Sequence, residues 1–224
     1  MEALDGLLRA IEDGDADAVR RIAGAQPELL EATDGYGFTP LMHAAGCMSR
    51  EVAVIRELLD AGAAVNRQTA EGYTALHCAI DVNGEANLNT REVIALLLAA
   101  GADLTLRQHY GWTPLLTAVV EGTPAEVEAL LAAGADPNVT LPYDTLPAFN
   151  AGRTALMAAV ANCHSEAIVE ALLRAGAEPR ARDATGATFY DYVAETLEEY
   201  PDGDFAESVR RCLAIARRYD GGGT

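Results

Sequence analysis

The side chains best suited to metal binding or nucleophilic catalysis are four histidines and four cysteines. Two pairs are adjacent in sequence, His77 with Cys78 and Cys163 with His164, and adjacent residues on a helix do not face one another. The cysteines include no C-x-x-C pair, and no set of these histidines and cysteines has the spacing of a zinc site. We therefore expect no catalytic residue, no metal and no cofactor, and we expect that the chain is not an enzyme.

The charge of the chain limits the partners that it could bind. Its formal net charge is −18, and all 16 basic residues are arginine. So acidic a surface repels phosphate backbones, which argues against nucleic acid and permits a basic protein partner. The alternative is that the charge serves solubility alone. The absence of lysine also excludes a G-x-x-x-x-G-K-[ST] phosphate loop, and it suggests a bacterial source with a GC-rich genome.

The composition is that of a folded chain with few aromatic residues. Half of the 224 residues are hydrophobic and 6% are aromatic, which favours closely packed helices over a β-sandwich. The N-terminus lacks the features of a signal peptide, and the longest apolar stretch, residues 93–102, is too short to span a membrane. We expect a cytoplasmic monomer without membrane contact.

A seven-residue phrase that starts with Thr recurs along the chain. Four copies begin at Thr39, Thr74, Thr113 and Thr154, and a degenerate copy begins at Thr188. Thr is a favoured helix N-cap, and the Pro that follows it in two copies fits the first helical turn. Leu and Ala spaced three to four residues apart then give one apolar face, so the phrase predicts a first helix. A Gly two residues before each Thr predicts a tight turn.

A second phrase, Leu-Leu followed by Gly-Ala, comes after each of the first four copies. Its glycines are Gly62, Gly101, Gly134 and Gly176. Because Gly adopts the left-handed conformation at low cost, the phrase predicts the end of a second helix. The second helices are expected to begin after Ser49, Thr90, Thr123 and Ser165. Thr123 and Glu126 have the spacing of a capping box.

Thr-Pro-Leu-x-x-Ala followed by Leu-Leu-x-x-Gly-Ala-Asp resembles the ankyrin repeat over roughly residues 2–218. The interval from Gly101 to Gly134 is 33 residues, the period of that family. The resemblance implies an all-α fold, an ankyrin-repeat solenoid of stacked helix-turn-helix units with finger loops. It also implies a structural role for His77.

The resemblance predicts a single domain, 1–224. Its segments are an N-terminal cap at 1–33, repeats at 34–66, 67–105, 106–138 and 139–179, a C-terminal cap at 180–220 and a frayed tail at 221–224. Two insertions depart from the regular period, about six residues within 81–90 and eight within 139–150. Each insertion is either neutral drift in a surface loop or part of a binding surface.

Partners of this family usually contact the finger loops and the first helices. The residues just before each Thr and their neighbours are therefore candidates, and stacking would gather five of their rings in one strip. Aromatic and arginine side chains are enriched at binding hot spots, although the rings could equally pack against the next finger. The predicted partner-binding residues are Tyr36, Phe38, Glu71, Tyr73, Asp81, Tyr110, Trp112, Glu121, Tyr143, Phe149 and Arg153.

The expected function is that of a protein–protein interaction module, an adaptor or scaffold. The alternative is a dedicated inhibitor or immunity protein that neutralises a basic toxin or enzyme. The net charge of −18 mildly favours this alternative.

Overall fold

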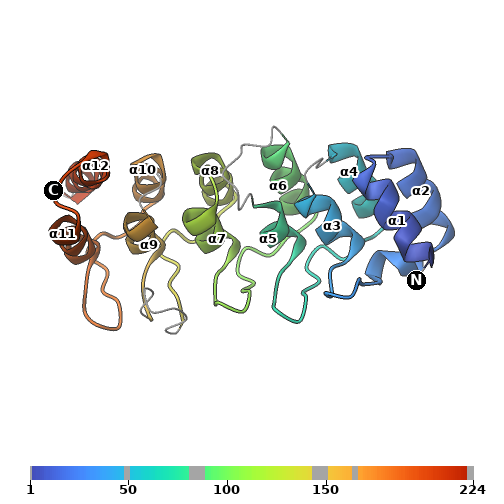
Figure 1. Ribbon diagram of the computed structural model, residues 1–224, viewed down its shortest axis with the longest axis horizontal. Helices are drawn as coiled ribbons and strands as arrows, with labels where there is room; N and C mark the ends of the chain where they lie inside the picture. The colour runs from blue at the N-terminus through green and yellow to red at the C-terminus, as the bar shows by residue number, and fades with distance from the viewer. Residues whose placement is uncertain (1, 48–50, 81–88, 143–150, 163–165, 221–224) are drawn as a thin grey trace. The chain divides into compact units, whose positions relative to one another are not determined.

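The computed structural model describes residues 2–47, 51–80, 89–142, 151–162 and 166–220. The chain divides into two compact units, residues 1–109 and 110–224. Figure 1 labels the helices of both units. The regular secondary structure of the described residues is helical, and their β-structure is one isolated antiparallel bridge between Thr140 and Thr154. The predicted all-α class is confirmed.

Unit 1 consists of three helix pairs and one short 3-10 helix. The helices are α1 (Glu2–Glu12), α2 (Ala16–Ala25), η1 (Pro27–Glu31), α3 (Pro40–Gly46), α4 (Val52–Asp60), α5 (Ala75–Ala79) and α6 (Thr90–Ala99). The first helices α1, α3 and α5 pack on one another in order, and the second helices α2, α4 and α6 do the same.

Unit 2 repeats this arrangement. Its helices are α7 (Pro114–Glu121), α8 (Pro124–Ala132), α9 (Ala155–Asn162), α10 (Glu166–Arg174), α11 (Phe189–Glu199) and α12 (Asp204–Asp220). α7, α9 and α11 form one layer, and α8, α10 and α12 form the other. Within each unit the loops between helix pairs extend from the side of the first helices (Figure 1).

The Thr residues of the first phrase begin the first helices as predicted. The hydroxyl of Thr39 accepts a hydrogen bond from the Met42 N–H at 3.3 Å, and Thr154 does the same for Met157 at 3.2 Å. Each bond satisfies an N–H that the first turn leaves without a helical partner. The leucine that follows in each phrase is buried, so the cap also fixes which face of the helix enters the core.

The Leu-Leu…Gly-Ala phrase ends each second helix by a repeated pair of hydrogen bonds. At the end of α4, the Gly62 N–H donates to the Leu59 carbonyl at 3.0 Å and the Ala63 N–H donates to the Leu58 carbonyl at 3.0 Å. The same two bonds recur at α6, α8 and α10, and the Gly has a positive φ each time. This is the Schellman geometry, so the phrase specifies the helix end through its backbone.

The predicted starts of the second helices are only partly correct. The capping box of α8 is confirmed, because the Thr123 N–H donates to Glu126 Oε2 at 2.7 Å. The prediction for α6 is wrong, since Thr90 is its first helical residue and Asn89 is the N-cap. α4 begins after Glu51, and Ser49 and Ser165 lie outside the described residues.

Successive fingers are joined by backbone hydrogen bonds within each unit. In unit 1 the His109 N–H donates to the Glu71 carbonyl at 2.7 Å, and in unit 2 the Ala184 N–H donates to the Ala151 carbonyl at 2.8 Å. Asparagine side chains add a second link. The Asn66 side chain donates to the Gly101 carbonyl and accepts a hydrogen bond from the backbone N–H of Asp103. The Asn138 side chain donates to the Gly176 carbonyl and accepts from the backbone N–H of Glu178. These links set the spacing of neighbouring fingers.

Candidate functional site

The candidate site is a groove of about 390 Å³ in unit 1, between the first finger and the first helices. Ile11 and Glu12 come from the end of α1, and Phe38 comes from the finger that precedes α3. The same finger adds Asp34 and Tyr36, and α5 contributes Cys78. The other lining residues come from α3 and its C-cap: Met42, His43, Gly46 and Cys47.

The finger that carries Tyr36 and Phe38 is held by Asp34. One Asp34 carboxylate oxygen accepts hydrogen bonds from the Tyr36 N–H at 2.8 Å and from the Phe38 N–H at 2.9 Å. The other oxygen lies 3.0 Å from His43 Nε2. Desolvation alone would raise the pKa of Asp34, but the two backbone N–H groups and His43 together hold its pKa below the ordinary value. The carboxylate therefore stays ionised, and it fixes the turn and His43 at once.

Tyr36 is the most exposed large hydrophobic side chain of the described residues, with 84% of its surface accessible. Phe38 is half-buried, and its ring meets the ring of His43 edge-on at a centroid distance of 6.0 Å. Ile11 and Met42 are buried at the floor of the groove. The groove therefore combines an apolar floor with an uncovered aromatic ring.

The other predicted site residues of unit 1 are Glu71 and Tyr73. The Glu71 side chain is exposed, and the half-buried Tyr73 ring lies between His77 and His109, at 6.1 and 5.9 Å. His77 is buried and its Nδ1 lies 2.9 Å from the Thr74 hydroxyl, so the structural role predicted for it is confirmed. Tyr73 therefore forms part of the finger packing, whereas Tyr36 and Phe38 line the groove.

In unit 2 two of the predicted surface residues are buried. Trp112 is 4% exposed, with its ring 5.6 Å from that of Tyr110, and Arg153 is 2% exposed. The Arg153 guanidinium lies 4.3 Å from the centre of the Tyr192 ring, and desolvation lowers its pKa. The prediction that these two side chains offer a partner an exposed surface is wrong. Tyr110 remains partly exposed at 36%.

The remaining predicted residues lie on the surface or outside the described part. Glu121 is an exposed residue at the end of α7, and desolvation raises the pKa of its carboxyl. Asp81, Tyr143 and Phe149 lie outside the described residues. The Leu141 N–H donates to the Arg153 carbonyl at the base of the 139–150 insertion. The alignment of five rings across both units stays a prediction.

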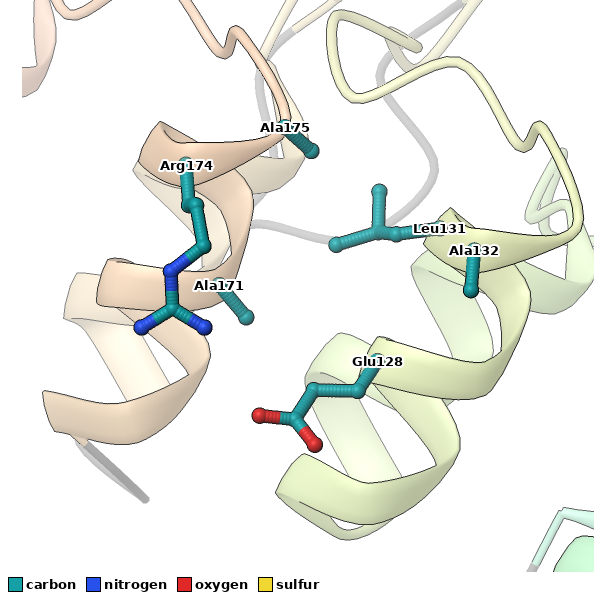
Figure 2. Close-up of a pocket in the computed structure, with 6 residues that line it drawn as sticks. All are labelled: Glu128, Leu131, Ala132, Ala171, Arg174 and Ala175. Atoms are coloured by element: carbon teal, nitrogen blue, oxygen red, sulfur yellow. The ribbon is translucent and has the colours of Figure 1, made fainter.

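Unit 2 has a shallow depression of about 380 Å³ between α8 and α10 (Figure 2). Three of its lining residues are alanines, whose small side chains do not fill the space between the helices: Ala132, Ala171 and Ala175. Glu128 and Arg174 extend from the two helices near one end of the depression. Arg174 forms an exposed ion pair with Glu170 at 3.7 Å. This depression lacks the uncovered aromatic ring of the unit 1 groove, so we regard that groove as the stronger site.

The described part of the chain contains no group of three or more His, Cys, Asp or Glu side chains arranged to hold a metal ion. None of its helices is both long enough and apolar enough to cross a membrane.

The sequence predicted Tyr36 and Phe38 as binding residues, but it did not predict most of the other residues that line the groove. Glu12, His43 and Cys78 come from three different helices, and only the packing of α1, α3 and α5 brings them together. Asp34 could have indicated the structured turn of this finger from the sequence, because it stands three residues before Gly37, as Asp183 stands three residues before Gly186. Asp183 binds its own turn in the same way, through Thr185 and Ala187.

The comparisons with known proteins agree with this architecture. A family model described as ankyrin repeats (3 copies) matches residues 7–108 and 85–183. The chain is 30% identical over 167 residues to Ankyrin repeat protein nuc-2 of Neurospora crassa, which covers 60% of this chain and 15% of that protein. It is 33% identical over 132 residues to Putative ankyrin repeat protein YahD of Escherichia coli, which covers 58% of this chain and 62% of that protein. The matches therefore span less than two thirds of either relative.

Two solved structures resemble nearly the whole chain. An ankyrin repeat domain from Acinetobacter baumannii AYE superposes with a TM-score of 0.70 at 27% identity, covering 94% of this chain and 97% of that one. The ankyrin repeat domain of Bcl-3, a member of the IkappaB protein family, superposes with a TM-score of 0.69 at 26% identity, covering 95% and 97%.

Proposed function

Because this chain belongs to the ankyrin-repeat family, whose repeats generally act as protein–protein interaction modules, we propose that it binds another protein through the unit 1 groove. The observation that carries the proposal is the Tyr36 ring, 84% exposed beside an apolar groove. An exposed ring beside an apolar hollow is typical of binding surfaces, where aromatic side chains supply much of the affinity. Members of the family are typically not enzymes, and we propose no catalytic role for this one.

The proposal is tested by measuring partner affinity for three forms of the full chain. Tyr36→Ala should weaken binding about tenfold or more, because the ring supplies contact area that alanine lacks. Tyr200→Ala is the matched control, since Tyr200 is 50% exposed and lies outside the groove. The partner is first captured from the organism's lysate with the unaltered chain and identified by mass spectrometry. Equal binding by Tyr36→Ala and the unaltered chain would contradict the proposal.

An inhibitor of a basic toxin or enzyme is the second candidate function, favoured by the net charge of −18. Attraction between oppositely charged proteins accelerates their encounter and is screened by salt. The same complex, measured over a salt series, separates the two candidates. A steep fall of the association rate with ionic strength favours the inhibitor, and a shallow fall favours the adaptor.

A further inference from the structure

We propose that the occupant of the unit 1 groove is a basic peptide segment, in which an Arg or Lys stands next to one large apolar side chain. This inference rests on the proposed function and narrows the partner to one chemical class. It is drawn from the floor of the groove, from the charges at its edge and from the exposed ring of Tyr36.

The floor of the groove favours an apolar side chain. Ile11 and Met42 are buried there, and the half-buried Phe38 ring forms one wall. A Leu, Met or aromatic residue of the occupant would pack against this floor and remove the exposed part of the Phe38 ring from water.

The charges of the groove favour a cation. Glu12 and Asp34 both line it, and no arginine is among its lining residues. Glu12 is exposed at the end of α1, and no side-chain hydrogen bond or ion pair of Glu12 is found among the described residues. Asp34 is ionised, and its carboxylate can accept about four hydrogen bonds. Three of these positions are occupied by the Tyr36 N–H, the Phe38 N–H and His43 Nε2, which leaves about one for a cation. Two carboxylates without a facing arginine attract a positively charged group.

The exposed ring of Tyr36 gives the cation a third partner. A guanidinium or ammonium over an aromatic face is attracted by the electron-rich face of the ring. An Arg or Lys side chain is also long enough to cover the ring with its methylene groups while its charged end meets a carboxylate. One basic side chain can therefore engage Tyr36 and the acidic edge together, while its apolar neighbour occupies the floor.

The inference is tested by selecting from a displayed library of random dodecapeptides on the immobilised full chain. The expected result is enrichment of peptides with Lys or Arg adjacent to a large apolar residue, relative to the unselected library. The affinity of each enriched peptide is then measured for four variants of the chain. All four positions are exposed, so the variants should fold: Tyr36→Ala, Glu12→Gln, Tyr200→Ala and Glu28→Gln.

The groove variants should weaken binding, and the matched controls should not. We expect a loss of about tenfold for Tyr36→Ala and of about 2- to 5-fold for Glu12→Gln, typical of one ring and one exposed charge pair. Tyr200→Ala and Glu28→Gln make the same chemical changes outside the groove and should leave affinity unchanged. Replacing the basic residue of the peptide by Gln should abolish the effect of Glu12→Gln.

The outcomes separate this inference from the function on which it rests. Enriched peptides that depend on Tyr36 but lack basic residues would overturn the inference and leave groove binding standing. Peptides that bind all four variants equally would overturn both. A selection that yields no groove-dependent peptide also counts against the inference, since the library contains the proposed class of segment.

Discussion

The repeated glycines show how single residues determine the packing of the fingers. Nine glycines of the two phrases have φ values between 76° and 98°. At Gly72 a second requirement is added, because a Cβ there would lie 2.6 Å from the Arg107 carbonyl oxygen and 2.9 Å from the Gln108 Cα. Gly62 has the same kind of backbone, with φ 95°, but a Cβ there would meet nothing within 4 Å.

These two positions therefore give a matched pair of substitutions. Gly62→Ala should cost about 1–2 kcal/mol of stability, the penalty for a side chain in the left-handed region. Gly72→Ala should cost about 1–3 kcal/mol more, because the backbone of the next finger must move. Chemical denaturation of the full chain, followed by helical circular dichroism, measures both. Equal destabilisation by the two substitutions would contradict the close packing of the fingers.

The burial of Arg153 could not be predicted from its residue type or from its place in the repeat. Arg153 was expected to contact a partner because it stands just before a Thr, yet it is covered by Tyr192 from a helix that begins 36 residues later in the sequence. The turns that Asp34 and Asp183 hold are local, and their glycines could be predicted from spacing alone. Contacts over long intervals, such as Arg153 on Tyr192, depend on how α9 and α11 pack.

At the scale of elements, the groove depends on the stacking of α3 against α5. A Cβ at Gly46 on α3 would lie 3.4 Å from the Cys78 Cβ on α5. The Cβ atoms of natural disulfides are about 3.5–4.5 Å apart, so the two helices hold these positions near the geometry of a disulfide. The phrases in the sequence predict both helices, but the distance between them follows only from their packing.

This stacking predicts a specific cross-link. In a Cys47→Ser background, Gly46→Cys should form a disulfide with Cys78 under mild oxidation, because the required shift is small. Gly24→Cys on α2 is the control, since a Cβ there meets nothing within 4 Å, and it should remain an unlinked thiol. Mass spectrometry of the digested protein identifies the linked peptides. A Gly46→Cys variant that stays fully reduced, or that links to another cysteine, would contradict the stacking.

At the scale of the whole molecule, the repeats could be predicted and the site only in part. The period and the two phrases predicted helix pairs with finger loops over almost the entire chain, and both units have them. They could not show which finger leaves an aromatic ring uncovered. Tyr36 and Tyr110 both stand three residues before the Thr of their repeat, yet Tyr36 is 84% exposed and Tyr110 is 36% exposed. That difference arises from the neighbours that cover each ring.

The central claim is that a partner protein contacts the groove beside Tyr36. Its most direct test places a photo-activated cross-linker, p-benzoylphenylalanine, at position 36 and, in a second variant, at position 200, and illuminates each in cells of the source organism. The account predicts one specific protein cross-linked from position 36 and not from position 200, through a peptide that mass spectrometry can map. A partner cross-linked only from position 200, or equally from both positions, would contradict the claim.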